Sequence, residues 1–255
     1  MTPTLYNFSQ STCSQKVRLV LWEKGIAFED RLVDHKSREH LQPAYLKLNP
    51  NGVVPTLVHG GAIIIDSSVI CEYLDEVFPD VPMSMPDPVG RAHMRKWLRY
   101  FEEVPTPAIR VPSFNKYLVK RYANLSDEAY AEMAGNHPIR KHFYQRLAKS
   151  RFSEAETDEA LDRLQQTVDR VEEALATDGR DWLMGDRLTL ADICLLPTID
   201  RMADLGLGAM WQGSHPAVEG WYRRFSARPA FKKTYYPGTR LTEIFDRAGL
   251  TPAPP

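Results

Sequence analysis

The chain has 255 residues, which at about 100–200 residues per domain suggests one large domain or two modest ones, and we favour two. Its 43% hydrophobic and 25% charged residues are typical of a globular protein and exclude a disordered one. The 32 basic and 33 acidic residues leave a formal net charge of −1, so no overall positive charge attracts nucleic acid or an anionic membrane surface. We expect neither as a partner.

The cysteines, Cys13, Cys71 and Cys194, are odd in number and lack metal-ligand spacing. This pattern predicts reduced thiols rather than a disulfide framework, and no metal site. The first residues lack the basic and then apolar pattern of a signal segment, and no apolar run approaches the roughly 18 residues that a membrane helix needs. We therefore expect a cytoplasmic protein without a membrane span.

The first 80 residues alternate short strand and helix patterns. Residues 4–8 predict a strand, and residues 14–24 predict a helix whose apolar face carries Val17, Val20 and Leu21. Gly25 then suits the C-cap of that helix.

The rest of this region predicts three further strands and a helix. A second strand is expected at 28–33, and the turn residues Asn49-Pro50-Asn51-Gly52 precede strands at 56–58 and 62–65. A helix follows over 67–77, with Val69, Ile70, Tyr73, Leu74 and Val77 expected to be buried. The predicted order is βαβ and then ββα.

Four prolines at positions 79, 82, 86 and 88 break regular structure and mark a linker between two domains. Beyond it the strand pattern disappears, and long helices are predicted at 91–103, 158–176 and 190–204. Thr189 and Asp192 fit a capping box in which Asp replaces the usual Glu or Gln. The second half should therefore be all-helical.

Four motifs in this order carry a resemblance to a known family. They are Ser11-Thr12-Cys13-Ser14, Asn49-Pro50-Asn51-Gly52-Val53-Val54-Pro55, Asp66-Ser67-Ser68-Val69-Ile70-Cys71-Glu72-Tyr73-Leu74 and Leu188-Thr189-Leu190-Ala191-Asp192. Together they resemble the cytosolic glutathione transferase superfamily. The resemblance implies a thioredoxin-like glutathione-binding domain at 1–79 with a mixed four-stranded sheet, a linker at 80–89 and an all-helical acceptor domain at 90–255. It also implies glutathione as co-substrate and a homodimer.

Within the superfamily the chain is similar to theta-like bacterial enzymes, and particularly to lignin β-aryl-etherases that cleave aryl ethers with glutathione. The supporting segments are residues 69–79 and the polar, aromatic insertion at 125–152. This resemblance implies that the glutathione thiolate attacks a small hydrophobic, aromatic electrophile. The acceptor pocket should lie between the domains and be lined from residues 100–117, where Phe101, Ile109, Phe114 and Tyr117 supply apolar surface.

The catalytic candidates are hydroxyls at the start of the first helix. A helix N-terminus offers unpaired N–H groups and a partial positive charge, which stabilise a thiolate held beside it. Ser11 matches the catalytic serine of theta-like members, and Ser14 is the second candidate, although either could simply cap the helix. Cys13 leaves open a thiol-disulfide reductase, and a non-catalytic binding or regulatory protein with the same fold is a further alternative.

The resemblance also implies a set of glutathione-binding residues. Val54 matches the residue whose backbone pairs with the cysteinyl part of glutathione, and Pro55 matches a cis-proline. Asp66 and Ser67 stand where the family has Glu-Ser, with the Ser hydroxyl and the following helix receiving the γ-glutamyl carboxylate. His40 matches a position near the glycine carboxylate, although a lone surface histidine is an equal alternative.

Overall fold

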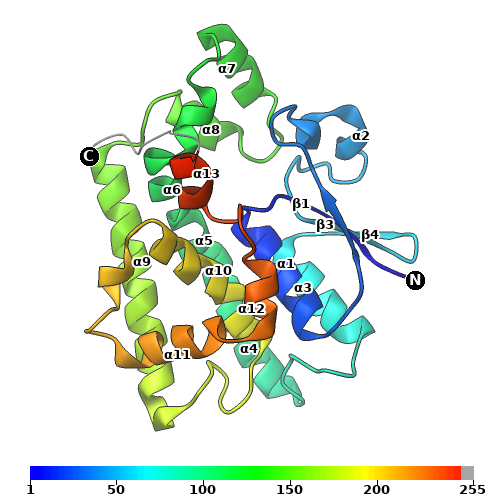
Figure 1. Cartoon of the computed structure of the whole chain (residues 1–255), viewed down its shortest axis with the longest axis vertical. Coiled ribbons are helices and arrows are strands. Elements are labelled where there is room, and N and C mark those ends of the chain that lie inside the picture. The colour runs from blue at the N-terminus through cyan, green and yellow to red at the C-terminus, as the bar shows by residue number, and fades with distance from the viewer. Residues whose placement is uncertain (248–255) are drawn as a thin grey trace.

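The computed structural model describes residues 1–247. Figure 1 shows the β-sheet and its helices on one side of the molecule and a larger group of helices on the other. No helix in the described part of the chain is long and apolar enough to cross a membrane.

The sheet has four strands, which are β1 (Thr4–Asn7), β2 (Glu29–Leu32), β3 (Thr56–His59) and β4 (Ala62–Ile65). Their order is β2-β1-β3-β4, with β2 parallel to β1 and the other two pairs antiparallel. The predicted mixed four-stranded sheet is therefore confirmed. The parallel pair needs a crossover, which α1 (Thr12–Glu23) supplies.

Helix α1 begins two residues before the predicted start because Ser11 caps it from outside. Val17, Val20 and Leu21 are fully buried, as the apolar pattern predicts. Lys24 is the C-cap in place of the predicted Gly25, and Gly25, at φ +65°, is the residue that follows the cap. That left-handed conformation is the one in which glycine costs least.

Helix α3 (Ser67–Val77) has the predicted bounds, but two of its expected core residues are exposed. Val69 and Val77 are 45% and 42% accessible, so their predicted burial is wrong. The buried face instead carries Ile70, Cys71 and Leu74, together with the small Ser67 and Ser68 at its start. Three- and four-residue spacing places Ile70, Cys71 and Leu74 on one stripe; Val69 falls to its side, and Val77 lies on the stripe but is the last residue of the helix.

The remaining helices form the second group, whose described residues contain no strand beyond an isolated bridge between Trp182 and Gly185. The α-helices are α4 (Pro88–Glu103), α5 (Pro105–Ala108), α6 (Arg110–Lys116), α7 (Asp127–Gly135), α8 (Lys141–Leu147), α9 (Glu154–Ala176), α10 (Leu190–Asp204), α11 (Pro216–Ser226), α12 (Pro229–Thr234) and α13 (Leu241–Arg247). The short α2 (Pro43–Leu46) belongs to the sheet side, and 3-10 turns lie at η1 (Glu39–Leu41), η2 (Leu118–Tyr122), η3 (Thr177–Gly179) and η4 (Gly208–Met210).

Helix α1 joins the two groups, because it packs against α3 on one side and against α10 and α12 on the other. Lys16 of α1 is 1% exposed, and its Nζ lies 2.6 Å from a carboxylate oxygen of Glu102 on α4. The bidentate contact of Arg228 with Glu23, at 2.6 and 2.7 Å, adds a second ion pair across the junction.

The predicted capping box at the start of α10 is confirmed and is completely buried. One carboxylate oxygen of Asp192 accepts from the Thr189 N–H at 2.9 Å and lies 3.0 Å from the Thr189 hydroxyl. The other accepts from the Leu183 N–H at 2.8 Å and from the Trp221 Nε1–H at 3.0 Å. Asp192 therefore fastens α10 to the loop before it and to α11.

Candidate functional site

A cavity of about 130 Å³ lies between the sheet domain and the helical group, at the N-terminus of α1. The sheet side contributes Phe8, Gln10, Ser11, Thr12, Cys13, His35, His40, Gly52, Val53 and Val54. The helical side contributes Ile109, Arg110, Ser113, Phe114, Leu118, Arg121, Tyr122, His137, Arg140, Tyr144, Arg201 and Leu241. A wider space of about 790 Å³ adjoins it and shares Phe8, Gln10, His35, Arg121 and Tyr122.

The two predicted hydroxyl donors have different environments. Ser11 lines the cavity, and its Oγ accepts a hydrogen bond from the Ser14 N–H at 3.2 Å. Ser14 is fully buried outside the cavity wall, and its Oγ has no hydrogen-bond partner among the described residues. Only Ser11 of the two is therefore placed to reach a ligand in the cavity.

Thr12 and Cys13, in the first turn of α1, also line the cavity and are partly exposed. Neither was among the predicted site residues, although Cys13 was considered as an alternative nucleophile. The match to the catalytic serine of theta-like members drew the prediction to Ser11, while the start of the helix, which places all three at the cavity, was predicted two residues late.

The segment before β3 brings backbone groups to the cavity. The Val54–Pro55 peptide bond is cis, as the resemblance implies. Val54 lines the cavity and makes no backbone hydrogen bond with any described residue, whereas the Val53 carbonyl is occupied by Tyr45 and Asn49. The N–H and C=O of Val54 are thus available to pair with an extended peptide.

Asp66 and Ser67 lie at the start of α3 and outside the cavity wall. Asp66, at φ +71°, is the N-cap, and its Oδ1 accepts from the Ser68 and Val69 N–H groups at 3.0 and 3.2 Å and from the Ser68 hydroxyl. One oxygen of the Asp66 carboxylate therefore caps the N-terminus of α3. The Ser67 hydroxyl makes no hydrogen bond with the described residues. Pro55 is likewise outside the wall, so Ser11, His40 and Val54 are the predicted residues that the cavity brings together.

His40 is buried in a cluster of aromatic rings rather than lying free on the surface. Its ring centroid is 5.3 Å from that of Phe8, 5.5 Å from His35 and 6.1 Å from His137. Burial and the neighbouring Arg140 lower the pKa of His40 to about 4, so the imidazole is neutral at pH 7. Burial also lowers the pKa of His35 and of His137 to about 3.

Four arginines, Arg110, Arg121, Arg140 and Arg201, are among the residues that line the helical side of the cavity. None of them was predicted from the sequence. Arg110 begins α6, Arg121 lies in η2, and Arg140 precedes α8. Burial and the charge of Arg140 lower the pKa of Arg110 to about 10. No Asp or Glu is among the described residues that line the cavity, so the wall carries a net positive charge.

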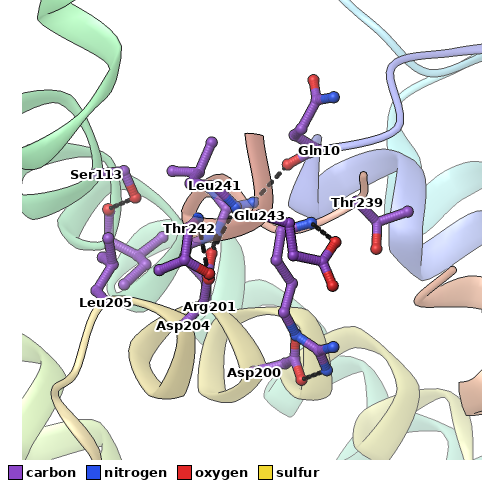
Figure 2. Close-up of polar contacts among 12 residues, drawn as sticks. Gln10, Ser113, Asp200, Arg201, Asp204, Leu205, Thr239, Leu241, Thr242 and Glu243 are labelled. Carbon is purple, nitrogen blue, oxygen red and sulfur yellow. Dashed lines mark hydrogen bonds and ion pairs between the residues drawn. The ribbon is translucent and has the colours of Figure 1, made fainter. Parts of the chain in front are cut away.

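Leu241, in the last described segment, lines the cavity together with Arg201, and Figure 2 shows the polar contacts around these two residues. Arg201 of α10 donates to the Gln10 carbonyl at 2.6 Å, and its charge is balanced by Asp204 at 3.5 Å. Asp204 also accepts from the backbone N–H of Leu241 at 2.8 Å, which holds the start of α13 over α10. This network positions the loop that leads into Ser11.

The expected acceptor lining at 100–117 is present in part. Ile109 and Phe114 line the cavity, together with Arg110 and Ser113. Phe101 and Tyr117 are each 1% exposed and belong to the helical core. The described residues also contain no group of three His, Cys, Asp or Glu side chains placed to hold a metal ion.

Two family models match the chain. The glutathione S-transferase N-terminal domain matches residues 10–77, and the glutathione S-transferase C-terminal domain matches residues 131–229.

Individual proteins agree with these matches. Protein LigF of Sphingobium sp. strain SYK-6 is 32% identical over 92% of this chain and 93% of its own length. The crystal structure of the beta-etherase LigF from that strain matches with a TM-score of 0.84, covering 92% of this chain and 98% of that one. The tetrachloro-p-hydroquinone reductive dehalogenase of Sphingobium chlorophenolicum is 28% identical over 90% of this chain and 94% of its own.

A glutathione transferase family member from Pseudomonas fluorescens, solved with two glutathione molecules bound, shares the fold at 20% identity. Its TM-score is 0.71, with 91% of this chain and 92% of that one covered. These matches confirm the predicted fold and the prediction of a glutathione transferase enzyme. The chain belongs to the glutathione S-transferase family.

Proposed function

We propose that this protein activates the thiol of glutathione with the Ser11 hydroxyl and directs the thiolate at an electrophilic carbon of an aromatic acceptor. The observation that carries the proposal is the position of Ser11, which caps α1 and faces the interdomain cavity. Its Oγ accepts a hydrogen bond from the Ser14 N–H, while no described residue accepts its proton. That proton is available for a sulfur anion.

The thiolate needs stabilisation because a free cysteine thiol has a pKa of about 8.5. Lowering that pKa by about two units corresponds to about 2.7 kcal/mol in favour of the thiolate. A hydroxyl donor together with the N-terminus of the 12-residue α1 is of the right strength, since a hydrogen bond to a charged group contributes about 1.5–3 kcal/mol.

Glutathione would lie along the segment before β3 that contains Val54. The free N–H and C=O of Val54 would pair with its cysteinyl residue, and Ser67 with the N-terminus of α3 would receive the γ-glutamyl carboxylate. His40 would act near the glycine carboxylate as a neutral N–H donor, because burial keeps its pKa near 4. One oxygen of Asp66 is used by the helix cap, which leaves the other for the ammonium group.

The reaction that we favour is cleavage of a β-aryl ether. The thiolate sulfur forms a bond to the carbon that carries the ether oxygen, the carbon–oxygen bond breaks, and the aryl group leaves as phenolate with the bonding electron pair. The similarity to the beta-etherase LigF supports this choice. So do the aromatic side chains of Phe8, Phe114, Tyr122 and Tyr144, which line the cavity and offer stacking surface to an aryl group.

The test compares Ser11→Ala with Ser11→Thr, which keeps the hydroxyl, and with Ser14→Ala as a matched control. We expect Ser11→Ala to raise the pKa of bound glutathione by about 1–2 units and to lower kcat/KM by about 10- to 100-fold. The pKa is read from the ultraviolet absorbance of the bound thiolate, and turnover from a panel of β-aryl ethers and a general electrophile. Unchanged values for Ser11→Ala would refute the assignment, and absence of any turnover with bound glutathione would indicate a binding protein.

Cys13 supports a second candidate function, because its thiol lines the same cavity and is partly exposed. As a nucleophile it would form a mixed disulfide with glutathione, with the other thiol of a disulfide substrate leaving as thiolate. Loss of turnover in Cys13→Ala but not in Ser11→Ala, with a mixed disulfide detected by mass spectrometry, would favour this thiol-disulfide reductase.

Further expectations belong to the proposal. We propose that the protein acts as a homodimer in the cytoplasm, with glutathione and a small hydrophobic electrophile as its partners and no resident metal. We also propose that the domain boundary lies at 80–89. Sedimentation analysis of the purified protein would test the dimer, and limited proteolysis within 80–89 would test the boundary.

A further inference from the structure

Three arginines face the cavity without an ion-paired carboxylate in the described part of the chain. Within the described residues, Arg110, Arg121 and Arg140 have no ion pair with a carboxylate and donate no hydrogen bond. Arg121 lies over the ring of Phe245, with its guanidinium carbon 5.7 Å from the centroid. The charges of Arg110 and Arg140 repel each other, and burial weakens their solvation.

Two other arginines of the helical group, Arg201 and Arg240, are paired with carboxylates. Arg201 lies 3.5 Å from Asp204, and Arg240 makes a contact of 2.8 Å with Asp200. Buried charges are normally paired, because an isolated charge is costly to remove from water. Arg110, Arg121 and Arg140 therefore differ from Arg201 and Arg240 in having no ion-paired carboxylate among the residues that the structure describes.

Histidines line the same cavity as these arginines. His40 and His137 are 6% and 2% exposed, and the Nδ1 atom of each is buried without a hydrogen-bond partner. The positive charge of Arg140 contributes to lowering the pKa of both, and the charge of Arg121 contributes to lowering the pKa of His35. Unsatisfied polar atoms in a native interior call for an explanation, and a ligand in the cavity is one.

We propose that the acceptor substrate carries a carboxylate or a comparable anionic group, which Arg110, Arg121 and Arg140 bind while glutathione occupies the sheet side. The arginines come from α6, η2 and the segment before α8, whereas the proposed glutathione contacts come from α1, η1, α3 and the segment before β3. The anion thus belongs to the second substrate. This inference rests on the proposed function for the place of glutathione.

An anionic acceptor also explains the shape of the site. The aromatic side chains Phe114, Tyr122 and Tyr144 lie among the arginines, so a ring and an acidic group can be held together. Guanidinium groups bind carboxylates in a planar, bidentate way, which would fix the orientation of the electrophilic carbon toward Ser11. The wider space that adjoins Arg121 offers an entrance.

Two pairs of probes that differ only in charge test the proposal. The first pair is a chlorodinitrobenzoate, with chloride para to the carboxylate, and its amide. Glutathione forms the same carbon–sulfur bond with either, and chloride leaves in both cases. The second pair, dinitrobenzoate and dinitrobenzamide, cannot react. Its dissociation constants are measured with S-methylglutathione saturating, so anion binding is tested even without turnover.

The variants are Arg110→Met and Arg140→Met, with Arg140→Lys to retain the charge. Arg146→Met is the matched control, because Arg146 is exposed, lies on α8 outside the cavity and pairs with Glu156. Circular dichroism melting confirms that each variant is folded. We expect each Met variant to raise the KM of the carboxylate acceptor and the Kd of dinitrobenzoate by about 10- to 100-fold. The amides should change by less than about threefold, and Arg140→Lys should recover most of the loss.

Several results would overturn the proposal. Equal binding of dinitrobenzoate and dinitrobenzamide to the unaltered protein would do so. A rise in the KM of glutathione in the Met variants, with no change for the acceptor, would also do so, because it would assign the arginines to the carboxylates of glutathione. Competition between a second glutathione molecule and dinitrobenzoate, with S-methylglutathione already bound, would assign the arginine pocket to glutathione as well. Selective binding of dinitrobenzoate without any turnover would support the anion site and refute the proposed transferase reaction instead.

Discussion

Replacing Asp192 by Asn changes one atom in the capping box of α10 and should cost far more stability than a surface substitution. Each carboxylate oxygen of the fully buried Asp192 contacts two donor groups, at 2.8 to 3.0 Å. An amide retains one oxygen and turns the other into a donor. If the amide nitrogen faces Leu183 and Trp221, two buried N–H groups lose their acceptor.

The opposite orientation is cheaper. The amide nitrogen then faces Thr189, whose hydroxyl can rotate and accept, so only the Thr189 N–H is left without a partner. An unsatisfied buried donor costs about 1–3 kcal/mol, and the nitrogen also stands against an N–H group. We therefore expect the free energy of unfolding to fall by about 2–4 kcal/mol.

Urea unfolding followed by circular dichroism measures this effect. The control is Glu156→Gln, since Ser153 and Glu156 form the same capping box at the exposed start of α9, with contacts of 2.8 and 2.9 Å. This variant also weakens the exposed pair of Glu156 with Arg146, so its loss of stability is an upper limit for the capping box. The exposure of this box limits the expected change to below about 1 kcal/mol. Equal urea midpoints for the two variants would refute the view that burial, rather than the motif, makes Asp192 important.

Other substitutions test the site and the domain junction. Ser14→Ala removes a buried hydroxyl without a partner, so the melting temperature should stay the same or rise, and a fall would show that the hydroxyl has a partner. Lys16→Met leaves Glu102 without its cation and should lower the urea midpoint, whereas Lys16→Met with Glu102→Gln should recover part of the loss. His137 has a pKa near 3 in the folded protein but about 6.5 when unfolded, so the unfolded chain takes up a proton as the pH falls between these values. Stability should therefore decrease toward acid by up to about 1.4 kcal/mol per pH unit for this group, and His137→Phe should flatten the curve of melting temperature against pH.

Local patterns in the sequence predict much of the fold. Short strands, the α3 bounds and the α10 capping box depend on residues within one element, and these predictions agree with the structure. Hydrophobicity alone misplaced Val69 and Val77, because the part of a helix that becomes buried, around its axis and along its length, depends on the elements packed against it. Sequence patterns contain no record of those neighbours.

The arginine side of the cavity illustrates a second limit. Arg110 and Arg140 are thirty positions apart and lie in a chain with almost balanced charge, so composition gives no sign of a local excess. What distinguishes them is that neither has an ion-paired carboxylate within the described residues, and that both line one cavity, which only the folded chain determines. Ser11 and Val54 could be found beforehand because their motifs are contiguous.

Helix α1 has two roles. Its first turn borders the cavity, and its body packs between α3 on the sheet side and α10 and α12 of the helical group. Fragments cut at the proline-rich connection would expose Lys16 and the apolar flank of this helix to water, and we expect neither half to persist alone. Directed evolution that loosens α12 or α10 in search of new substrates would therefore also disturb the sulfur-activating hydroxyl. Diversity is more safely introduced at α7, which Figure 1 shows at the periphery of the helical group.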